Sequence, residues 1–420
     1  MKRLDIWGQV KPGLVAIVLI ALLLGIGIGW LIKPAPEVPA PEAPAKPTLT
    51  VFSLWSGDEE KAFKEVLAGF TKNSGIGVKH IPQTTEGLMI GMPVAFMAGR
   101  SPADVVLAPW PAWIRDLAKE GHIMPATGLV VGDEYSPTHL DELKVGGVLY
   151  GTPFKMAGKP GFWYRVSFFA QHGLTKPGTY EEFKALLAKL KGIPGIEAPI
   201  ASGNGVGWPL SDTTEAFIMG LGDPQLQLDL IASKVAWTSP EVKAVFGKLA
   251  ELLKARYFSV PAEWVGQKDK LWEGKYGIYF MGDWIAGMVP DATDLDFFPF
   301  PGTKGAAGAI DYAFVPKYAM YPEEAKELLK YLATAEAQQI WVKLGGFIAP
   351  NLKVPAGLYT PTGRVVLEFL KGVRVVPDLD DAIGGMFQTT FWDQLKLLWV
   401  KPAELEAVLT ALDKVAPKPK

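Results

Sequence analysis

A chain of 420 residues is longer than one ordinary domain, so its length predicts two or three domains. With 49% hydrophobic and 20% charged residues, the chain can bury large cores, which excludes a protein that is disordered throughout. The net charge of -2 argues against a nucleic-acid partner, and the absence of cysteine excludes disulfides, thiolate-held metals and a cysteine nucleophile. Only four histidines occur and none share metal-ligand spacing, so no metal or other cofactor is expected.

The N-terminal segment predicts export and a membrane anchor. Residues 13–32 carry no charge, and about 20 residues at roughly 1.5 Å each span the hydrocarbon core of a bilayer. Basic residues precede this transmembrane helix, which places residues 1–12 in the cytoplasm and the rest of the chain outside the cell. The alternative is a long signal peptide cleaved near residues 43–45. In the first case the protein is held at the cell membrane, and the proline-rich residues 33–47 form a linker to an extracellular body.

From residue 48 onward, short apolar strands alternate with amphipathic helices, which is typical of parallel sheets covered by helices. Ser56 with Glu59, and Thr179 with Glu182, have the spacing of capping boxes at helix starts. The predicted strands are residues 49–55, 78–82, 103–107 and 277–281, and the predicted helices are residues 56–74, 87–98, 113–119 and 322–344, with two more beginning after Thr179 and Ser239.

Aromatic and acidic residues gather at strand ends, where open α/β sheets bind their ligands. An indole ring offers a flat partner for the apolar face of a sugar, and carboxylates bind its hydroxyl groups. These positions are residues 55–58, 109–110, 282–284 and 308–312, joined by the glycine-rich loops 203–208 and 345–347 and by residues 391–392 at a helix start. Other tryptophans fall in helical patterns and are expected to pack in the core, namely Trp113, Trp237, Trp264, Trp272, Trp341 and Trp399.

Several stretches, taken in their order and spacing, resemble the extracellular solute-binding proteins of ABC importers, in the family that includes maltose-binding protein. They are LTVFSLWSGDEEKAFKEVLAGFTKNSGIGV (49–78), SPADVVLAPWPAWIRDLAKEGHI (101–123), GVLYGTPF (147–154), GIYFMGDWIAGM (277–288), the stretch from YAFVPKY to GGFIAPN (312–351) and TTFWDQLKLL (389–398). The similarity extends from about residue 49 to residue 415.

The resemblance implies an α/β, two-lobed, periplasmic-binding-protein-like fold, in which each lobe is a mostly parallel sheet flanked by helices. It implies three crossings between the lobes, near residues 152–161, 297–302 and 345–348. The lobes are then residues 48–155 with 300–346, and residues 156–299 with 347–420. Such a protein is a monomer without enzymatic activity that closes a hinge on a carbohydrate ligand and delivers it to the membrane permease. The anchor helix, in place of a lipid-bearing cysteine, resembles an archaeal arrangement.

Eight positions that usually face the ligand in this family correspond here to Trp55, Ser56, Asp58, Trp110, Trp208, Trp284, Phe347 and Trp392. Four further residues at the first crossing and at strand ends complete the predicted ligand-binding set. They are Phe154, Lys155, Asp283 and Asp311.

Two alternative functions stay open at this point. Lys155, Lys159 and Arg165 crowd the first crossing, so in the first alternative the solute is an acidic sugar or another anion, such as a phosphorylated compound. A peptide or a polyamine is a further non-sugar solute that the same fold leaves open. In the second, the protein is an exported glycoside hydrolase that uses carboxylates such as Asp58, Asp283 and Asp311.

Overall fold

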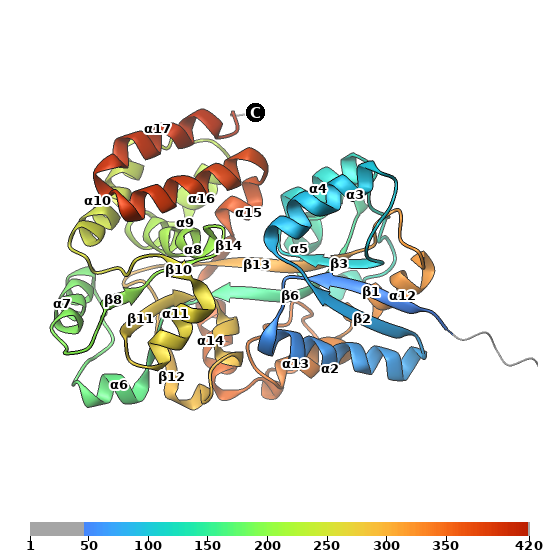
Figure 1. Ribbon diagram of the computed structural model, residues 1–420, viewed down its shortest axis with the longest axis horizontal. Helices are drawn as coiled ribbons and strands as arrows, with labels where there is room; N and C mark the ends of the chain where they lie inside the picture. Colours follow the sequence, from blue (N-terminus) through green and yellow to red (C-terminus); the bar gives the residue numbers. More distant parts are fainter. Residues whose placement is uncertain (1–45, 419–420) are drawn as a thin grey trace, which may run out of the picture. The chain divides into compact units, whose positions relative to one another are not determined.

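The computed structural model describes residues 46–418, so the predicted anchor at 13–32, the residues before it and nearly all of the linker lie outside the described residues. Among residues 46–418, no helix combines the length and the apolar character needed to cross a membrane. Within residues 47–420, which form one unit, two large sheets organise the chain (Figure 1).

The first sheet, with its helices, forms what we call the first lobe. Its strand order is β14-β13-β3-β1-β2, and β6 also pairs with β13. β1 runs parallel to β2 and β3, as strands joined by helices do, whereas β13 runs antiparallel to β3 and β6. The strands are β1 (Thr48–Ser53), β2 (Gly77–Pro82), β3 (Val105–Ala108), β6 (Thr152–Lys159), β13 (Gly305–Phe314) and β14 (Arg374–Pro377), and the helices are α2 (Gly57–Ser74), α3 (Met92–Met97), α4 (Pro111–Lys119), α5 (Pro137–Asp141), α12 (Pro322–Leu332) and α13 (Ala335–Val342).

The second sheet, in the second lobe, has the order β12-β7-β11-β8. The prediction of a mostly parallel sheet is wrong here, because only β8 and β11 are parallel, while β7 runs antiparallel to both β11 and β12. The reason is that β7 and β12 lead the chain in and out of the lobe. The strands are β7 (Gly161–Arg165), β8 (Ala198–Ala201), β11 (Tyr276–Met281) and β12 (Leu295–Phe298), and the helices are α6 (Val166–Gln171), α7 (Tyr180–Lys191), α8 (Trp208–Phe217), α9 (Pro224–Ile231), α10 (Pro240–Lys254), α11 (Trp264–Trp272), α15 (Leu379–Ile383), α16 (Gly385–Val400) and α17 (Leu405–Val415).

Three links join the two sheets. β6 continues into β7 through Pro160 alone, and Gly161 has a φ of 155°, at which a Cβ would lie 2.1 Å from the Phe298 carbonyl oxygen. β12 leads back to β13, which runs beside β6 (Figure 1). The third link is longer than predicted, because it includes α14 (Pro361–Gly372) and then β14, which pairs with β13 before the chain enters α15.

Helix starts differ from the sequence expectation in two places. The Thr179 capping box is confirmed, since its hydroxyl accepts from the Glu182 amide at 3.2 Å and the Glu182 carboxylate accepts in return. The Ser56 side chain makes no capping hydrogen bond, and the Glu59 carboxylate accepts from the Lys155 ammonium group. The predicted helix 322–344 is two helices, since Thr334 caps a new helix by accepting from the Ala337 amide.

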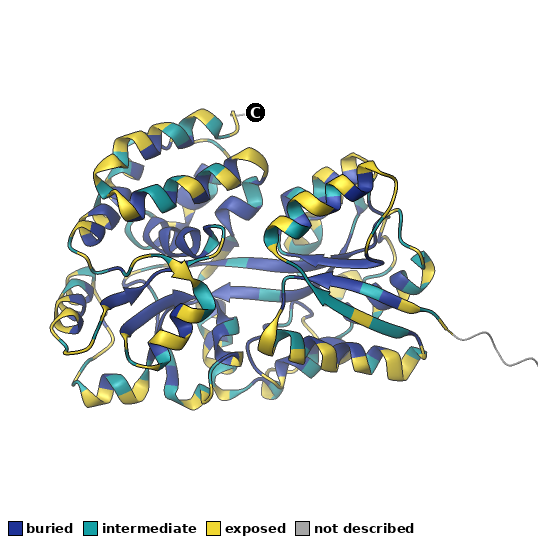
Figure 2. Cartoon of the chain, viewed as in Figure 1, coloured by how far each residue is buried: buried dark blue, intermediate teal, exposed yellow. Residues whose placement is uncertain are grey.

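Most strands are buried on both faces, whereas β2 and β14, at the edges of the first sheet, are partly exposed. Most helices bury one face and expose the other (Figure 2). One hydrophobic cluster extends through both lobes, joining Val51 and Trp341 of the first to Trp163 and Met281 of the second. Separate clusters cover the other face of each sheet. The two lobes therefore share a core on one side of the sheets.

Candidate functional site

A cavity of about 410 Å³ is lined by residues of both lobes. We call it the tryptophan cavity, because six indole side chains line it, those of Trp55, Trp110, Trp208, Trp264, Trp284 and Trp392. Its walls come from the ends of β1, β3 and β11, from β6 and β13 in the middle, and from the starts of α8 and α11. The carboxyl ends of several strands thus meet here, as expected for a ligand site of an α/β protein.

A second cavity, of about 830 Å³, lies between α2 and α11 and is called the α2–α11 cavity. It shares Glu59 and Trp284 with the tryptophan cavity, so the Trp284 side chain lies on the boundary between the two. Its walls carry charged residues of both helices, and Trp272 and Trp341 add aromatic surface.

The structure brings most of the predicted ligand-binding residues together. Those that line the tryptophan cavity are Trp55, Trp110, Lys155, Trp208, Trp284, Asp311 and Trp392. Asp58 lines the α2–α11 cavity instead, and it is exposed in the first turn of α2.

Four predicted residues line neither of these cavities. Ser56 is exposed at the start of α2. Phe154 and Phe347 are buried, with ring centroids 5.3 Å apart, and Phe154 lies 5.7 Å from the Trp55 ring. Asp283 is buried as well and accepts a hydrogen bond of 2.8 Å from the Gly158 amide. Phe154 therefore packs against the Trp55 ring, and Phe347 packs against Phe154.

The backbone places Trp284 directly after β11. The segment η4 (Asp283–Gly287) begins there, and the Trp284 ring folds back over Gly282. A Cβ on Gly282 would lie 1.9 Å from a ring carbon of Trp284, so a residue with a side chain would displace the indole. This close approach explains why glycine precedes Asp283 and Trp284 in the sequence.

Trp264 was expected to pack in the core, but it lines the tryptophan cavity. Its position at the first turn of α11 places the ring 5.5 Å from Trp208, at an interplanar angle of 66°. Trp208 in turn lies 5.8 Å from Trp284 at 60°. These three rings are half-buried, so the wall that they form keeps indole surface available to a ligand.

Lys155 is the charged residue of the first lobe that lies deepest beside the cavity. Its ammonium group donates to Glu59 at 2.5 Å and lies 4.6 Å from the Trp341 ring centroid. Burial lowers the pKa of Lys155, but the carboxylates of Glu59 and Asp311 outweigh burial and raise this pKa above its ordinary value. The lysine is therefore a charged and fully paired group.

Two carboxyls near Lys155 are held partly protonated near neutral pH. Burial raises the pKa of Asp283 to about 7, although Lys155 and the Gly158 amide oppose the shift. Burial likewise raises the pKa of Asp311 to about 7, again against the influence of Lys155. The second carboxylate oxygen of Asp283 is buried without a hydrogen-bond partner.

These shifts predict that stability falls as pH rises. The pKa of Asp311 is raised from 3.8 to about 7, so between these values the folded protein holds a proton that the unfolded chain has released. The contribution is present below about pH 4 and is lost as pH approaches 7. In Asp311→Asn, the decrease in the free energy of unfolding between pH 5 and pH 8 should be smaller by about 2 kcal/mol, as measured by urea denaturation. A pH dependence equal to that of the wild type, or of the exposed control Asp393→Asn, would contradict the assignment.

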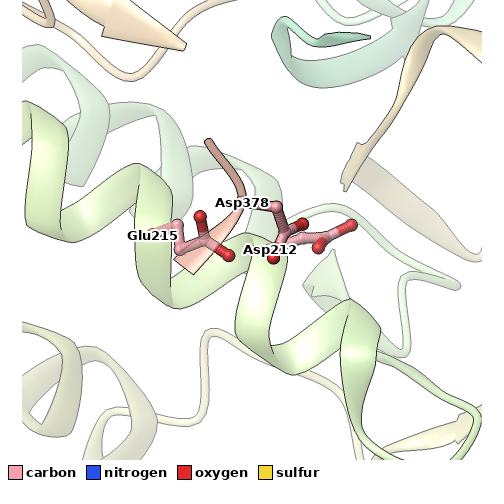
Figure 3. Close-up of side chains that lie close together, drawn as sticks. All are labelled: Asp212, Glu215 and Asp378. Atoms are coloured by element: carbon pink, nitrogen blue, oxygen red, sulfur yellow. The ribbon is translucent and has the colours of Figure 1, made fainter. Parts of the chain in front are cut away.

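A cluster of five buried carboxyl groups lies in the second lobe, at the edge of the tryptophan cavity. We call it the acidic cluster, and it consists of Asp212 and Glu215 on α8 and of Asp378, Asp380 and Asp381 at the start of α15. Three of these carboxylates lie side by side (Figure 3). Asp212, Glu215 and Asp378 each place one oxygen within 4.8 Å of the others, which is close enough to share a cation.

The ammonium group of Lys159, at the end of β6, supplies a cation to this cluster. It donates to the carboxylates of both Asp212 and Asp378. Burial lowers the pKa of Lys159, but the two carboxylates outweigh burial and raise it well above its ordinary value. Burial, together with Asp378, raises the pKa of Asp380 to about 8, although Ser211 donates to its carboxylate.

The sequence analysis missed the acidic cluster. A signal was present, because three acidic residues occur within the four residues Asp378–Asp381. Asp212 and Glu215 are also spaced to share one helix face, and helical residues around them are largely uncharged. Sequence alone does not show that such residues are buried, since acidic side chains are seldom buried unless they are paired.

Comparisons with known proteins agree with this fold. The family described as bacterial extracellular solute-binding protein matches residues 56–339. An ABC transporter extracellular-binding protein of Pyrococcus horikoshii is 47% identical over 374 residues, which are 88% of this chain and 89% of the relative. An osmoprotective compounds-binding protein of Synechocystis sp. is 25% identical over 401 residues, covering 88% of this chain and 92% of the relative.

Among solved structures, a bacterial solute receptor with an exclusive preference for β-D-galactopyranose has a TM-score of 0.77 at 20% identity, over 88% of this chain and 98% of the receptor. This likeness shows a shared two-lobed fold. The family match covers more than half of the sequence and confirms the resemblance seen there: the chain belongs to the family of bacterial extracellular solute-binding proteins.

Proposed function

We propose that this protein is the substrate-binding subunit of an ABC transporter and that it binds a mono- or oligosaccharide in the tryptophan cavity. The observation that carries the proposal is a cavity walled by six indole rings and by carboxylates of both lobes. Indole rings pack on the apolar face of a pyranose, and carboxylates accept hydrogen bonds from its hydroxyl groups. The galactopyranose receptor with the same fold supports a sugar as the ligand.

The dimensions of the site suit such a ligand. A volume of about 410 Å³ falls in the usual range of small-molecule sites. The α2–α11 cavity continues from Trp284 and offers room for further sugar units of a longer ligand.

The first alternative, an acidic solute, rested on the lysines of the first crossing. Lys155 is bonded to Glu59, and Lys159 is bonded to two aspartates. Arg165 lies outside the cavity and is bonded to Asp294. Since none of these cations is left unpaired, the arrangement favours a sugar over an anion.

The second alternative, a glycoside hydrolase, needs two carboxyl groups on opposite sides of one glycosidic bond. The three candidates do not meet around one cavity. Asp311 lines the tryptophan cavity, Asp58 lines the α2–α11 cavity, and Asp283 lines neither. These three residues therefore supply no such pair, and the match to solute-binding proteins supports a binding protein that releases its ligand unchanged.

Delivery to the transporter follows from a hinge motion in this proposal. A ligand that contacts both lobes stabilises the closed form, and the three links between the sheets form the hinge. The closed monomer then docks on the permease, while residues 13–32 hold it at the outer side of the membrane. The lobe limits predicted at residues 155/156, 299/300 and 346/347 belong to the same proposal, although β6 and β14 extend past these limits to pair with β13 in the first sheet.

A thermal-shift panel tests the function. It compares neutral mono- and oligosaccharides with uronic acids and sugar phosphates of matched ring configuration. A neutral sugar should raise the melting temperature in proportion to the logarithm of its concentration, because it binds the native form alone. Stabilisation by the anionic members only, or release of smaller sugars from a labelled oligosaccharide, would contradict a sugar-binding subunit.

A further inference from the structure

The tryptophan cavity is rich in carboxyl groups. Eight carboxyl side chains and two lysine side chains line it, so carboxyl groups outnumber ammonium groups by six, and burial raises the pKa of Asp311 to about 7 and that of Asp380 to about 8. Both ammonium groups are already bonded to carboxylates, one to Glu59 and the other to the acidic cluster. No arginine or histidine lines this cavity. The carboxyl groups that ionise therefore have no further cation among the described residues that line this cavity, and a bound cation would favour their ionised form.

Two cavity-lining carboxylates retain unpaired oxygen atoms. The carboxylate of Asp311, on β13 of the first lobe, accepts no hydrogen bond from residues 46–418. Asp381, on α15 of the second lobe, accepts from the Gln388 side chain at 2.7 Å with one oxygen, and its other oxygen has no donor among the described residues. The unpaired oxygens of Asp311 and Asp381 are not fully buried, so a ligand can reach them. Asp212 differs, because its unpaired oxygen is fully buried.

A neutral sugar satisfies this site only in part. Its hydroxyl groups donate hydrogen bonds, but they leave the repulsion between carboxylates of the two lobes in place. A protonated amine donates hydrogen bonds and also neutralises charge, and charge-assisted bonds are the stronger kind. The half-buried rings of Trp208, Trp264 and Trp284 add surfaces that attract cations.

We propose that the transported solute is a saccharide that bears a protonated amino group, and that Asp311 and Asp381 recognise this group from opposite lobes. The inference rests on the proposed function and names the solute class of the same cavity. Both carboxylates lie on regular, well-packed elements, since Asp311 is within the longest strand of the first sheet and Asp381 lies two residues after the buried Leu379 on α15. The recognition is therefore built into the scaffold rather than carried by a loop.

Calorimetric titration with matched pairs of sugars tests the inference. Each pair contains an amino sugar and its neutral relatives, such as glucosamine with N-acetylglucosamine and glucose, and the corresponding disaccharides, in gluco, galacto and manno configurations. We expect the best aminated member to bind at least about tenfold more tightly than its N-acetylated and hydroxylated counterparts. A neutral member that binds as tightly as its aminated counterpart would overturn the inference and leave the proposed function standing.

Two isosteric variants show whether the named residues carry the preference. Asp311→Asn and Asp381→Asn should each lower the ratio of aminated to neutral affinity by about tenfold, whereas the exposed Asp393→Asn should leave that ratio unchanged. If both variants fold, by circular dichroism, and keep the wild-type ratio, the assignment of these carboxylates is wrong. Spermidine serves as a charged probe without a sugar ring. Binding of spermidine with no binding of any saccharide would contradict the proposed function, and binding of none of these compounds would overturn both.

Discussion

Replacing Lys159 with methionine is expected to lower the free energy of unfolding by about 3–5 kcal/mol. Methionine fills a similar volume but removes the ammonium group that donates to Asp212 and Asp378. Five carboxyl groups are then left in a buried cluster without a cation. Removing one partner of a buried ion pair is costly because the remaining charge can neither reach water nor find another partner.

Urea denaturation at pH 8 measures the loss, with Lys119→Met as the matched control. Lys119 also donates to an aspartate, but both side chains are more than half exposed, and such surface pairs contribute less than about 1 kcal/mol. The double variant Lys159→Met with Asp212→Asn should recover part of the loss, since it also removes one of the unpaired charges. If Lys159→Met loses no more free energy of unfolding than Lys119→Met, the carboxyl groups of the acidic cluster are neutralised by protonation and do not need the lysine.

Replacing Trp284 with alanine is expected to weaken sugar binding by about 2–4 kcal/mol, or roughly 30- to 1,000-fold in affinity. The Trp284 ring is half-buried, packs edge-on against Trp208 and lies on the boundary of both cavities. Its truncation removes a flat apolar surface and opens one cavity into the other. Affinity is measured by titration with the best ligand of the thermal-shift panel.

The control for this variant is Trp272→Ala, because Trp272 lines the α2–α11 cavity alone. A monosaccharide held in the tryptophan cavity should bind Trp272→Ala and the wild type equally well. A longer oligosaccharide should lose affinity in both variants if it continues past Trp284. Unchanged affinity in a folded Trp284→Ala protein would remove this residue from the site.

The first lobe was largely predictable because its signals are local. The strand at 49–55, the helix after Ser56 and the strands near 78 and 103 each combine periodic apolar residues with a turn signal, and the structure has elements at all four places. The second lobe was predicted less well, since the direction of a strand in a sheet depends on pairing between distant segments. Nothing within residues 161–165 indicates that they run against β11.

Some residues of the candidate site could likewise be predicted from local sequence signals, and others could not. Trp55, Trp110 and Trp284 follow strands directly, so their convergence could be expected from topology. The position of Trp264 beside the cavity could not be predicted from topology, because the helical pattern of its segment does not show which side chains of the first turn line a cavity. The acidic cluster could not be predicted for another reason. Its burial depends on the ammonium group of Lys159, which is more than 50 residues from every member of the cluster in the sequence and meets them only in the folded protein.

The hydrophobic cluster that joins Val51 and Trp341 to Trp163 and Met281 has a consequence for how the protein comes apart. Neither lobe can unfold without exposing apolar surface of the other lobe. An intermediate with one lobe folded and the other unfolded is therefore unstable. Heating should therefore produce a single cooperative transition, and a protease should find few half-digested fragments.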